Sequence, residues 1–344
     1  MKIFKEIKRY FSIMLRFFPA WRLYGFSAAF WSLIFPFHHV FGFLRPFLGK
    51  KKHKAILSYL IDHYKDIIVK FSQRTSQPVS NIESSSTIWV CWWDGEEAMP
   101  DIVKVCWKSI RQHSGKHPVV LITKNNYKEY VSFPDYIMEK VNAKIITITH
   151  FSDILRANLL YEHGGIWMDA TILTLKDISL EDMPFFTLKA PAKKNNSISM
   201  ARFSGISDIT TPYRYNFSSP KISRWSGFLL AGVKGSIIFE YLRDILYSYW
   251  KDHNDQIEYF LVDYSIALGY DNIPDMKRLI DNVPTSTMEK FVLERKLNIE
   301  YNDDNFSSFL SVSFHKLSWK NKFDKYTKKQ KLTIYGHLIN SLGG

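Results

Sequence analysis

The chain has 344 residues, of which 46% are hydrophobic and 23% are charged, which is ordinary for a globular protein and gives enough length for a sizeable core. Its formal net charge is +13, but residues 1–54 hold +10 and residues 315–344 hold +6, so residues 55–314 are slightly acidic at −3. A nucleic-acid enzyme concentrates positive charge on its binding domain, so this distribution excludes nucleic acid as a partner and favours a phospholipid surface.

The N-terminal region contains a long uncharged stretch. Residues 23–44 are 22 residues without Lys, Arg, Asp or Glu, which is long enough to span a bilayer. However, Pro36, His38 and His39 interrupt the stretch, and basic residues flank it on both sides, whereas a single span carries positive charge mainly on one side.

Aromatic residues suited to a membrane interface run through the same region. They are Trp21, Tyr24, Phe26, Phe30, Trp31, Phe35, Phe37, Phe41, Phe43 and Phe47. We therefore expect residues 1–71 to be a basic, aromatic, helical region that contacts a membrane phospholipid surface in a peripheral or monotopic way. A full span and a helical subdomain packed on the main body are the alternatives.

The rest of the chain has a regular organisation. Helical periodicity at 54–71 is followed by a polar linker at 72–86. Beyond the linker we predict strands at 88–92, 118–123, 144–149 and 165–175, and helices at 101–112, 152–163, 236–250 and 255–268. This alternation predicts an α/β domain with a mostly parallel sheet flanked by helices. We assign the domain to residues 87–320 and expect residues 321–344 to form a basic C-terminal tail.

The two cysteines, Cys91 and Cys106, lie in the first part of this domain. They form no CxxC pair, and two residues cannot make a disulfide framework. They are typical of buried thiols in a reducing cytoplasm.

The helix predicted at 152–163 has polar residues at defined positions. Ser152 is a candidate N-cap, which puts Asp153 in the first helical turn. Arg156 follows three residues later, on the same helical face as Asp153. A surface ion pair between the two is the alternative to a functional role.

A glycine pair and an acid follow this helix. Gly164 is expected to end the helix, and Gly165 allows a tight turn into the next strand. Asp169 then falls at the carboxyl end of an apolar strand, where ligands collect in open α/β sheets. A carboxylate there can hold a divalent cation that neutralises a diphosphate leaving group. The alternative is an ordinary turn residue.

Residues 152–175 as a whole resemble the donor-site signature of the DXD-containing sugar transferases of glycosyltransferase family 32. They are similar in particular to the capsular-polysaccharide-synthesis relatives of that family. The signature reads S-D-x-x-R, an apolar helix, G-G, an apolar strand and D-x-D. The matching residues are Ser152, Asp153, Arg156, Gly164, Gly165 and Asp169. The chain departs at Thr171, which stands in place of the second Asp; the capsular branch often reads D-A-T there.

The resemblance implies a GT-A-like, Rossmann-related fold, a nucleotide-sugar donor, a Mn or Mg ion and a retaining mechanism. It implies that Asp153 binds the nucleoside and that Arg156 binds phosphate or the donor sugar. It makes Asp169 the catalytic residue that holds the metal or the donor-sugar hydroxyls. Gly165 and Thr171 belong to the same donor site.

The resemblance extends to the run His315-Lys-Leu-Ser-Trp-Lys. A late histidine in such enzymes reaches the metal and the diphosphate, so His315 is expected as a second metal ligand. Lys316 and Lys320 are then expected to contact phosphate. Trp92, at the end of the first strand, is expected beside the nucleotide.

Two further residues are candidates for the acceptor side. Trp225 can stack on a sugar face, although an aromatic residue in an α/β domain is more often part of the core. Asp263, on an otherwise apolar helix, can present a catalytic carboxylate to the acceptor. Its alternative is a partly buried, hydrogen-bonded aspartate.

We therefore expect a hexosyltransferase on the cytoplasmic face of a bacterial inner membrane. Its partners would be a nucleotide-sugar donor and an acceptor that is polyprenol-linked or a growing cell-surface polysaccharide. The alternative is a non-catalytic, membrane-associated scaffold of the capsule assembly machinery with a degenerate transferase domain, an interpretation that Thr171 keeps open.

Overall fold

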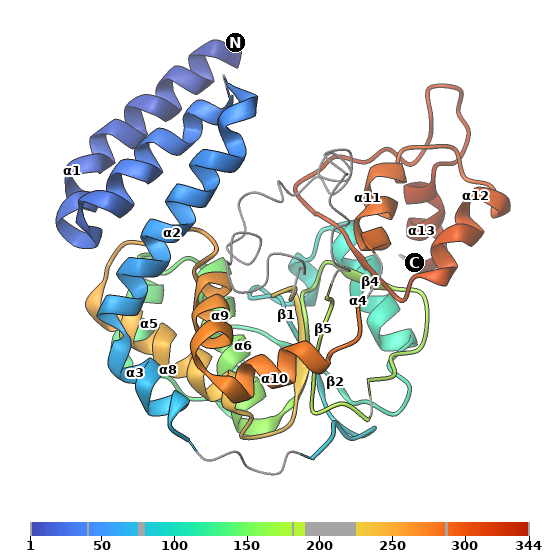
Figure 1. Cartoon of the computed structure of the whole chain (residues 1–344). Helices are drawn as coiled ribbons and strands as arrows, with labels where there is room; N and C mark the ends of the chain where they lie inside the picture. The colour runs from blue at the N-terminus through green and yellow to red at the C-terminus, as the bar shows by residue number, and fades with distance from the viewer. Residues whose placement is uncertain are drawn as a thin grey trace.

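The computed structural model describes residues 2–39, 41–74, 80–180, 182–189, 225–285 and 288–342. A helical hairpin at the N-terminus stands on one side of a central sheet flanked by helices. The helices near the C-terminus stand on the other side (Figure 1).

The hairpin is built from α1 (Lys2–Ile34), which a non-helical backbone at Gly25 (φ 78°, ψ 160°) divides into two helical segments, and from α2 (Arg45–His63). They are joined through the 3-10 turns η1 (Phe35–His39) and η2 (Gly42–Leu44). Within the part of the chain that the structure describes, none of the helices combines the length and the apolar character that crossing a membrane requires.

Polar contacts join the hairpin to the main body. The Tyr24 hydroxyl donates to the carbonyl oxygen of Asp255 at 2.8 Å, and the Tyr59 hydroxyl bonds to a ring nitrogen of His253 at 3.1 Å. α3 (Lys65–Ser72) then continues the chain along the main body, where it contacts α8 (Ile237–Asp252). The hairpin is therefore attached through a buried tyrosine and histidine cluster.

Five short strands form the central sheet, in the order β2-β1-β3-β6-β5. Their bounds are Ile88–Cys91 for β1, Val119–Ile122 for β2, Gly165–Met168 for β3, Phe185–Thr187 for β5 and Leu229–Gly232 for β6. β1 pairs in parallel with β2 and β3, whereas β6 is antiparallel to both β3 and β5. The predicted α/β domain with a mostly parallel sheet is thus confirmed.

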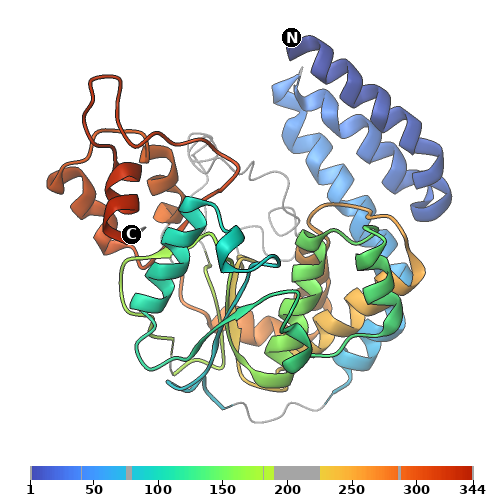
Figure 2. The same ribbon diagram turned by 180° about the vertical axis from the view of Figure 1, so that it is seen from behind.

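Helices flank this sheet (Figures 1 and 2). They are α4 (Asp101–Gln112), α5 (Asp135–Asn142), α6 (Ile148–His163), α8, α9 (Leu261–Asn272) and α10 (Pro274–Asn282), with short 3-10 turns at η3 (Glu96–Ala98) and η4 (Tyr127–Glu129). α6 packs against both β3 and α8.

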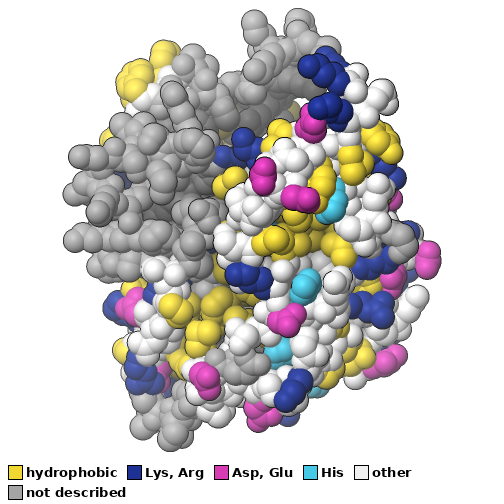
Figure 3. Space-filling model, turned by 90° about the vertical axis from the view of Figure 1, so that its right-hand side faces the viewer, with side chains coloured by type: hydrophobic (Ala, Val, Ile, Leu, Met, Phe, Trp, Pro, Cys, Tyr) yellow, Lys and Arg dark blue, Asp and Glu magenta, His cyan; other side chains and the backbone are white. Residues whose placement is uncertain are grey.

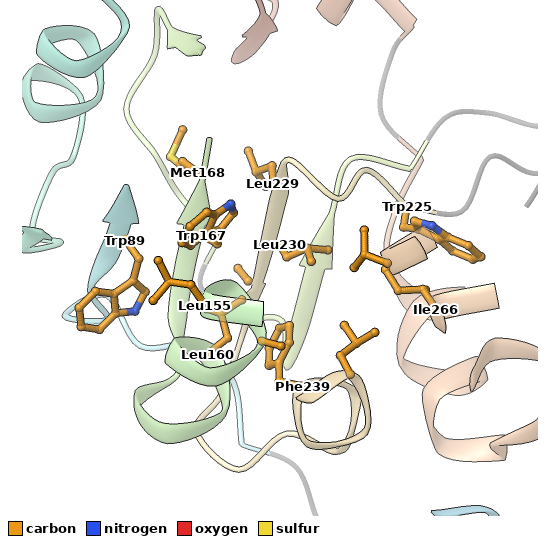
Figure 4. Close-up of a cluster of buried hydrophobic side chains, with 14 of the residues drawn as sticks. Trp89, Leu155, Leu160, Trp167, Met168, Trp225, Leu229, Leu230, Phe239 and Ile266 are labelled. Carbon is orange, nitrogen blue, oxygen red and sulfur yellow. The ribbon is translucent and has the colours of Figure 1, made fainter. Parts of the chain in front are cut away.

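The core between α6 and the sheet is apolar (Figure 4). Leu155 and Leu160 of α6 are fully buried, as are Leu230 of β6 and Phe239 of α8. Trp167 of β3 lies in the same cluster at 1% exposure. This packing fixes α6 against β3, and therefore fixes the polar residues that each element presents at the sheet's carboxyl edge.

The C-terminal segment folds back on the main body instead of forming a tail. It contains η6 (Met288–Phe291), α11 (Val292–Lys296), α12 (Asp303–Ser307), η7 (Ser308–Ser311) and α13 (Ile334–Leu342). α13 packs on α4 with Ile334 and Leu338 buried. On the face that carries these helices, Lys and Arg side chains are interspersed with Asp and Glu (Figure 3).

The strand expected at 165–175 is two strands in two different sheets. β3 ends at Met168, and a turn follows in which the Ile172 amide donates to the Asp169 carbonyl at 2.9 Å. β4 (Ile172–Thr174) then pairs with β7 (Phe314–Lys316) in a separate antiparallel sheet. This turn puts Asp169 at the junction between the two sheets.

The strand expected at 144–149 is wrong. The amides of Ile145 and Ile146 both donate to the carbonyl of Lys140 and so close the end of α5, and Lys144 has a positive φ of 59°. α6 begins at Ile148, and its N-cap is Thr147 instead of Ser152. The short apolar run has the composition of a strand, but its backbone ends one helix and begins the next.

Gly165 is required by close backbone approach. Its φ is +102°, and a Cβ there would lie 2.3 Å from the carbonyl oxygen of Thr87. Replacing Gly165 with alanine is therefore expected to lower the free energy of unfolding by about 3 kcal/mol or more, measured by urea denaturation. Gly115 is the matched control, because it has a φ of +60° and a Cβ added there would meet no atom within 4 Å; its alanine variant should lose only about 1 kcal/mol. Equal losses in both variants would contradict the role of the contact with Thr87.

Candidate active site at the carboxyl end of β3

Asp169 lies directly after β3 and is held by cations and an indole. Its Oδ1 accepts from the Trp167 indole at 3.0 Å and from Arg156 at 3.4 Å, and its Oδ2 accepts from the Lys316 ammonium at 2.9 Å. Burial alone would raise the pKa of Asp169, but Lys316 and Arg156 hold that pKa below its ordinary value. With 29% of its side chain exposed, Asp169 presents an ionised carboxylate at this edge.

Arg156 reaches Asp169 from α6. Its guanidinium lies 3.2 Å from the Asp153 carboxylate one helical turn earlier and 5.0 Å from the centre of the Trp167 ring. A Cβ at Gly227 would come within 3.3 Å of the guanidinium, so a glycine leaves the room that Arg156 occupies. The side chain is 6% exposed, and two carboxylates and an aromatic face therefore hold a buried cation in one position.

The pKa values of Asp153 and of a third carboxylate near Arg156, that of Asp263, are both perturbed. Burial raises the pKa of Asp153 to about 7, although Arg156 opposes the rise. Burial likewise raises the pKa of Asp263 to about 6, although Asp263 accepts from the Trp225 indole at 3.0 Å. Buried acids with perturbed pKa values around one cation are typical of functional sites, and ion-pair networks with a structural role also produce them.

Lys316 completes the cluster from β7. Pairing of β7 with β4 sets Lys316 opposite Ile172, and the Leu317 amide donates to the Thr171 carbonyl at 2.9 Å. The Lys316 ammonium donates to Asp169 Oδ2 and, at 2.5 Å, to the Thr171 hydroxyl. The second sheet thus delivers a lysine to the two side chains that follow β3.

A pocket of about 800 Å³ opens over this cluster, a volume within the range of small-ligand sites. Trp92 and Trp319 form part of its wall in an edge-to-face contact with ring centres 5.9 Å apart. Its other lining residues include Ser152, Asp169, Thr171, Tyr259, Arg295, Lys316 and Lys320. Aromatic rings beside three cations suit a ligand that has both a flat ring and phosphate groups.

The structure brings most of the expected site residues together. Trp92, Asp169, Thr171, Lys316 and Lys320 line the pocket. Asp153 and Arg156 lie directly behind them. Helix α6 and the end of β3 therefore meet as the sequence suggested.

Three expected residues lie elsewhere, and a fourth, Asp263, is buried at 8% exposure and does not line the pocket. Gly165 begins β3, at the opposite end of that strand from Asp169. Trp225 is 1% exposed and belongs to the buried cluster in Figure 4, with its indole bonded to Asp263. His315 precedes Lys316 on β7 and therefore points to the other side, where its ring bonds to the Phe309 carbonyl at 3.0 Å. None of the three lines the pocket.

The pocket also contains residues that the sequence patterns do not predict. Trp319 lies inside the run 315–320, but nothing in that run distinguishes it from its neighbours. Tyr259 and Arg295 come from segments without a recognisable motif. Only the folded arrangement puts them beside Asp169.

The polar groups around Asp169 do not fit a divalent cation. Mg²⁺ and Mn²⁺ prefer several oxygen ligands, whereas both Asp169 oxygens and the Thr171 hydroxyl already accept from nitrogen donors. Among the residues that the structure describes, no group of three or more His, Cys, Asp or Glu is arranged to hold a metal ion. The Mn or Mg ion implied by the sequence resemblance stays a prediction.

Comparison with known proteins gives one family model and several solved structures. A family model described as "Capsular polysaccharide synthesis protein" matches residues 45–338. No curated protein matches the chain. Among the solved structures that match, "PaToxG Glycosyltransferase" is 14% identical with a TM-score of 0.34, and the match covers 70% of this chain and 84% of that one.

Proposed function

Because this chain belongs to the family of capsular polysaccharide synthesis proteins, we propose that it is a glycosyltransferase with a GT-A-like fold. It moves a hexose from a nucleotide-sugar to a polyprenol-linked or growing capsular polysaccharide. The observation that supports this most is the meeting of Arg156, Asp169 and Lys316 at the carboxyl end of β3, where Asp169 and Lys316 line an aromatic-walled pocket and Arg156 lies behind them.

The geometry suggests a role for each part of the pocket. Trp92 and Trp319 offer ring faces and edges to the nucleobase. Lys316 and Lys320, which also line the pocket, would contact the diphosphate. Asp169 keeps its negative charge beside them and can accept hydrogen bonds from donor-sugar hydroxyls. Catalysis then comes from positioning and from neutralising the departing diphosphate, which suits retention because no separate base is needed to activate the nucleophile.

A screen of nucleotide-sugars tests this function. Purified full-length protein should release nucleoside diphosphate from one class of UDP-, GDP-, ADP- or dTDP-sugar, and that nucleotide should raise its melting temperature. The screen is run in parallel with EDTA and with Mn²⁺ or Mg²⁺. If no donor is turned over and no nucleotide shifts the melting temperature in either condition, the scaffold interpretation is favoured over the enzyme.

The N-terminal hairpin supports placement on a membrane surface. Exposed large hydrophobic side chains gather on it, with Phe18 at 66%, Phe26 at 53% and Phe43 at 79% exposure. Exposed basic residues accompany them, and the Lys51 ammonium lies 5.7 Å from the centre of the Trp31 ring. We propose that this hairpin binds anionic phospholipid on the cytoplasmic face of the inner membrane, where a lipid-linked acceptor is found.

Vesicle binding tests this surface. Replacing Phe18, Trp21 and Phe26 together with serine should weaken partition onto anionic vesicles about tenfold or more, because three exposed rings no longer enter the interface. Flotation with phosphatidylglycerol vesicles measures the effect. The control variant replaces Leu310 and Tyr326, which are 45% and 53% exposed on the C-terminal segment, and it should float like the wild type. Equal flotation of both variants would rule out the hairpin as the contact surface.

A further inference from the structure

We infer that the Lys316 ammonium takes the place of a divalent cation, so that this protein binds and turns over its nucleotide-sugar without a metal ion. The inference rests on the proposed function and concerns the same pocket. It assigns to one side chain the neutralisation that the sequence resemblance gives to Mn or Mg.

The position of Lys316 is the first reason. Its Nζ donates to Asp169 Oδ2 at 2.9 Å and to the Thr171 hydroxyl at 2.5 Å. These two side chains occupy the first and third positions of the D-x-D pattern, which the sequence resemblance links to metal binding. A positive charge from the chain itself therefore already bridges them.

The ammonium is held in this position by the fold. Lys316 is the last residue of β7, and the Leu317 amide that follows it bonds to the Thr171 carbonyl. The Lys316 ammonium also lies 5.2 Å from the centre of the Phe228 ring, where a cation is attracted to the aromatic face. The pairing of β7 with β4 and the contacts with Asp169, Thr171 and Phe228 therefore all hold the ammonium in one position.

The neighbouring charges are the second reason. A divalent ion at Asp169 would lie close to both Lys316 and Arg156 and would be repelled by them. Asp153 already faces Arg156 at 3.2 Å. Asp94 at the pocket edge faces Lys124 at 3.0 Å. Asp153 and Asp94 are thus paired with protein cations, and Glu294, which also lines the pocket, accepts from the Asn321 amide at 2.7 Å.

In this arrangement, sugar transfer can proceed with Lys316, and without a metal ion, neutralising the departing diphosphate. An ammonium has three N–H donors, of which Asp169 and Thr171 take two, so one can be given to a phosphate oxygen. As the bond between the sugar anomeric carbon and the diphosphate oxygen breaks, its electron pair stays on that oxygen, and Lys316 stabilises the developing charge. The acceptor hydroxyl oxygen forms the new bond to the anomeric carbon, and its proton passes to the departing diphosphate.

Nucleotide binding in EDTA tests the inference. UDP, GDP, ADP and dTDP are titrated calorimetrically into EDTA-treated full-length protein and, separately, into protein with millimolar Mn²⁺. We expect the nucleotide that binds to have the same Kd in both conditions within about twofold. Lys316→Met should weaken its binding in EDTA by about a hundredfold, whereas Lys322→Met, at an exposed lysine nearby, should not change it.

A second variant tests the inference through the gain of a metal site. Thr171→Asp combined with Lys316→Met restores two acids and removes the ammonium. This double variant should bind Mn²⁺ itself, detected by the loss of the free-ion EPR signal, and should bind nucleotide only when Mn²⁺ is present.

The outcomes separate the two proposals. Nucleotide binding by the wild type that needs Mn²⁺ or Mg²⁺ and disappears in EDTA overturns the role of Lys316 while leaving the glycosyltransferase intact. Unchanged affinity of Lys316→Met in EDTA also overturns it. Failure of every nucleotide to bind in both conditions overturns the proposed function, and the inference with it.

Discussion

Replacing Asp169 with asparagine is expected to lower donor turnover by about a hundredfold to a thousandfold, the usual cost of losing one electrostatic group at a reacting centre. The carboxylate holds Arg156 and Lys316 in place through both of its oxygens. Asparagine keeps the shape but loses the charge, so these cations are no longer oriented toward the donor. Release of nucleoside diphosphate, measured at saturating donor, gives the effect.

The control for this variant is a surface carboxylate. Asp177 has a side chain that is 82% exposed and contacts His113, and Asp177→Asn should keep full activity. Circular dichroism must show that Asp169→Asn remains folded. A folded Asp169→Asn protein with wild-type turnover would remove the mechanism proposed for this site.

Replacing Arg156 with methionine is expected to lower the free energy of unfolding by about 3 kcal/mol or more, because removing one partner leaves buried charge uncompensated. Asp153 and Asp169 both lose their nearest guanidinium. Urea denaturation measures the loss. Adding Asp153→Asn to the variant should recover much of the stability without recovering donor turnover, which separates folding from function.

Arg243 provides a matched control for Arg156. It also faces two acids and lies over an aromatic ring, with its guanidinium 4.1 Å from the centre of the Tyr161 ring, but it is 21% exposed. Arg243→Met should cost only about 1 kcal/mol and leave turnover unchanged. Equal destabilisation by the two variants would show that Arg156 is an ordinary ion-pair residue.

The same cluster gives the sign of a pH effect on stability. Burial raises the pKa of Asp153 from 3.8 to about 7, so the folded state binds a proton that the unfolded state has released. Asp153 therefore costs stability increasingly as pH rises between those values. In Arg156→Met the loss should continue to higher pH, because the cation that opposes the raised pKa is gone.

Local sequence patterns were sufficient for part of the fold and of the site. The helix predicted at 101–112 is α4 (Asp101–Gln112), and the strand predicted at 118–123 contains β2. The spacing of Asp153 and Arg156, followed by a glycine pair and Asp169, correctly put three charged groups at one place. These features depend on the spacing of residues within one helix, turn or strand, which can be read from a single sequence.

Other features depend on tertiary contacts and could not be predicted in the same way. The antiparallel insertion of β6 beside β3 is set by pairing between segments far apart in the chain. Tyr259 and Arg295 reach the pocket from segments with no motif. His315 is different, because neighbouring residues on a strand face opposite sides: once Lys316 faces Asp169, His315 must face away.

Hydrogen exchange with bound nucleotide tests the central claim most directly. The nucleoside diphosphate that binds the full-length protein should slow exchange in residues 148–156, 169–171 and 316–321, which surround Arg156, Asp169 and Lys316, and should leave residues 303–311 unchanged. Protection confined to any other part of the chain would contradict the proposed donor site, since the nucleotide would then bind away from this cluster.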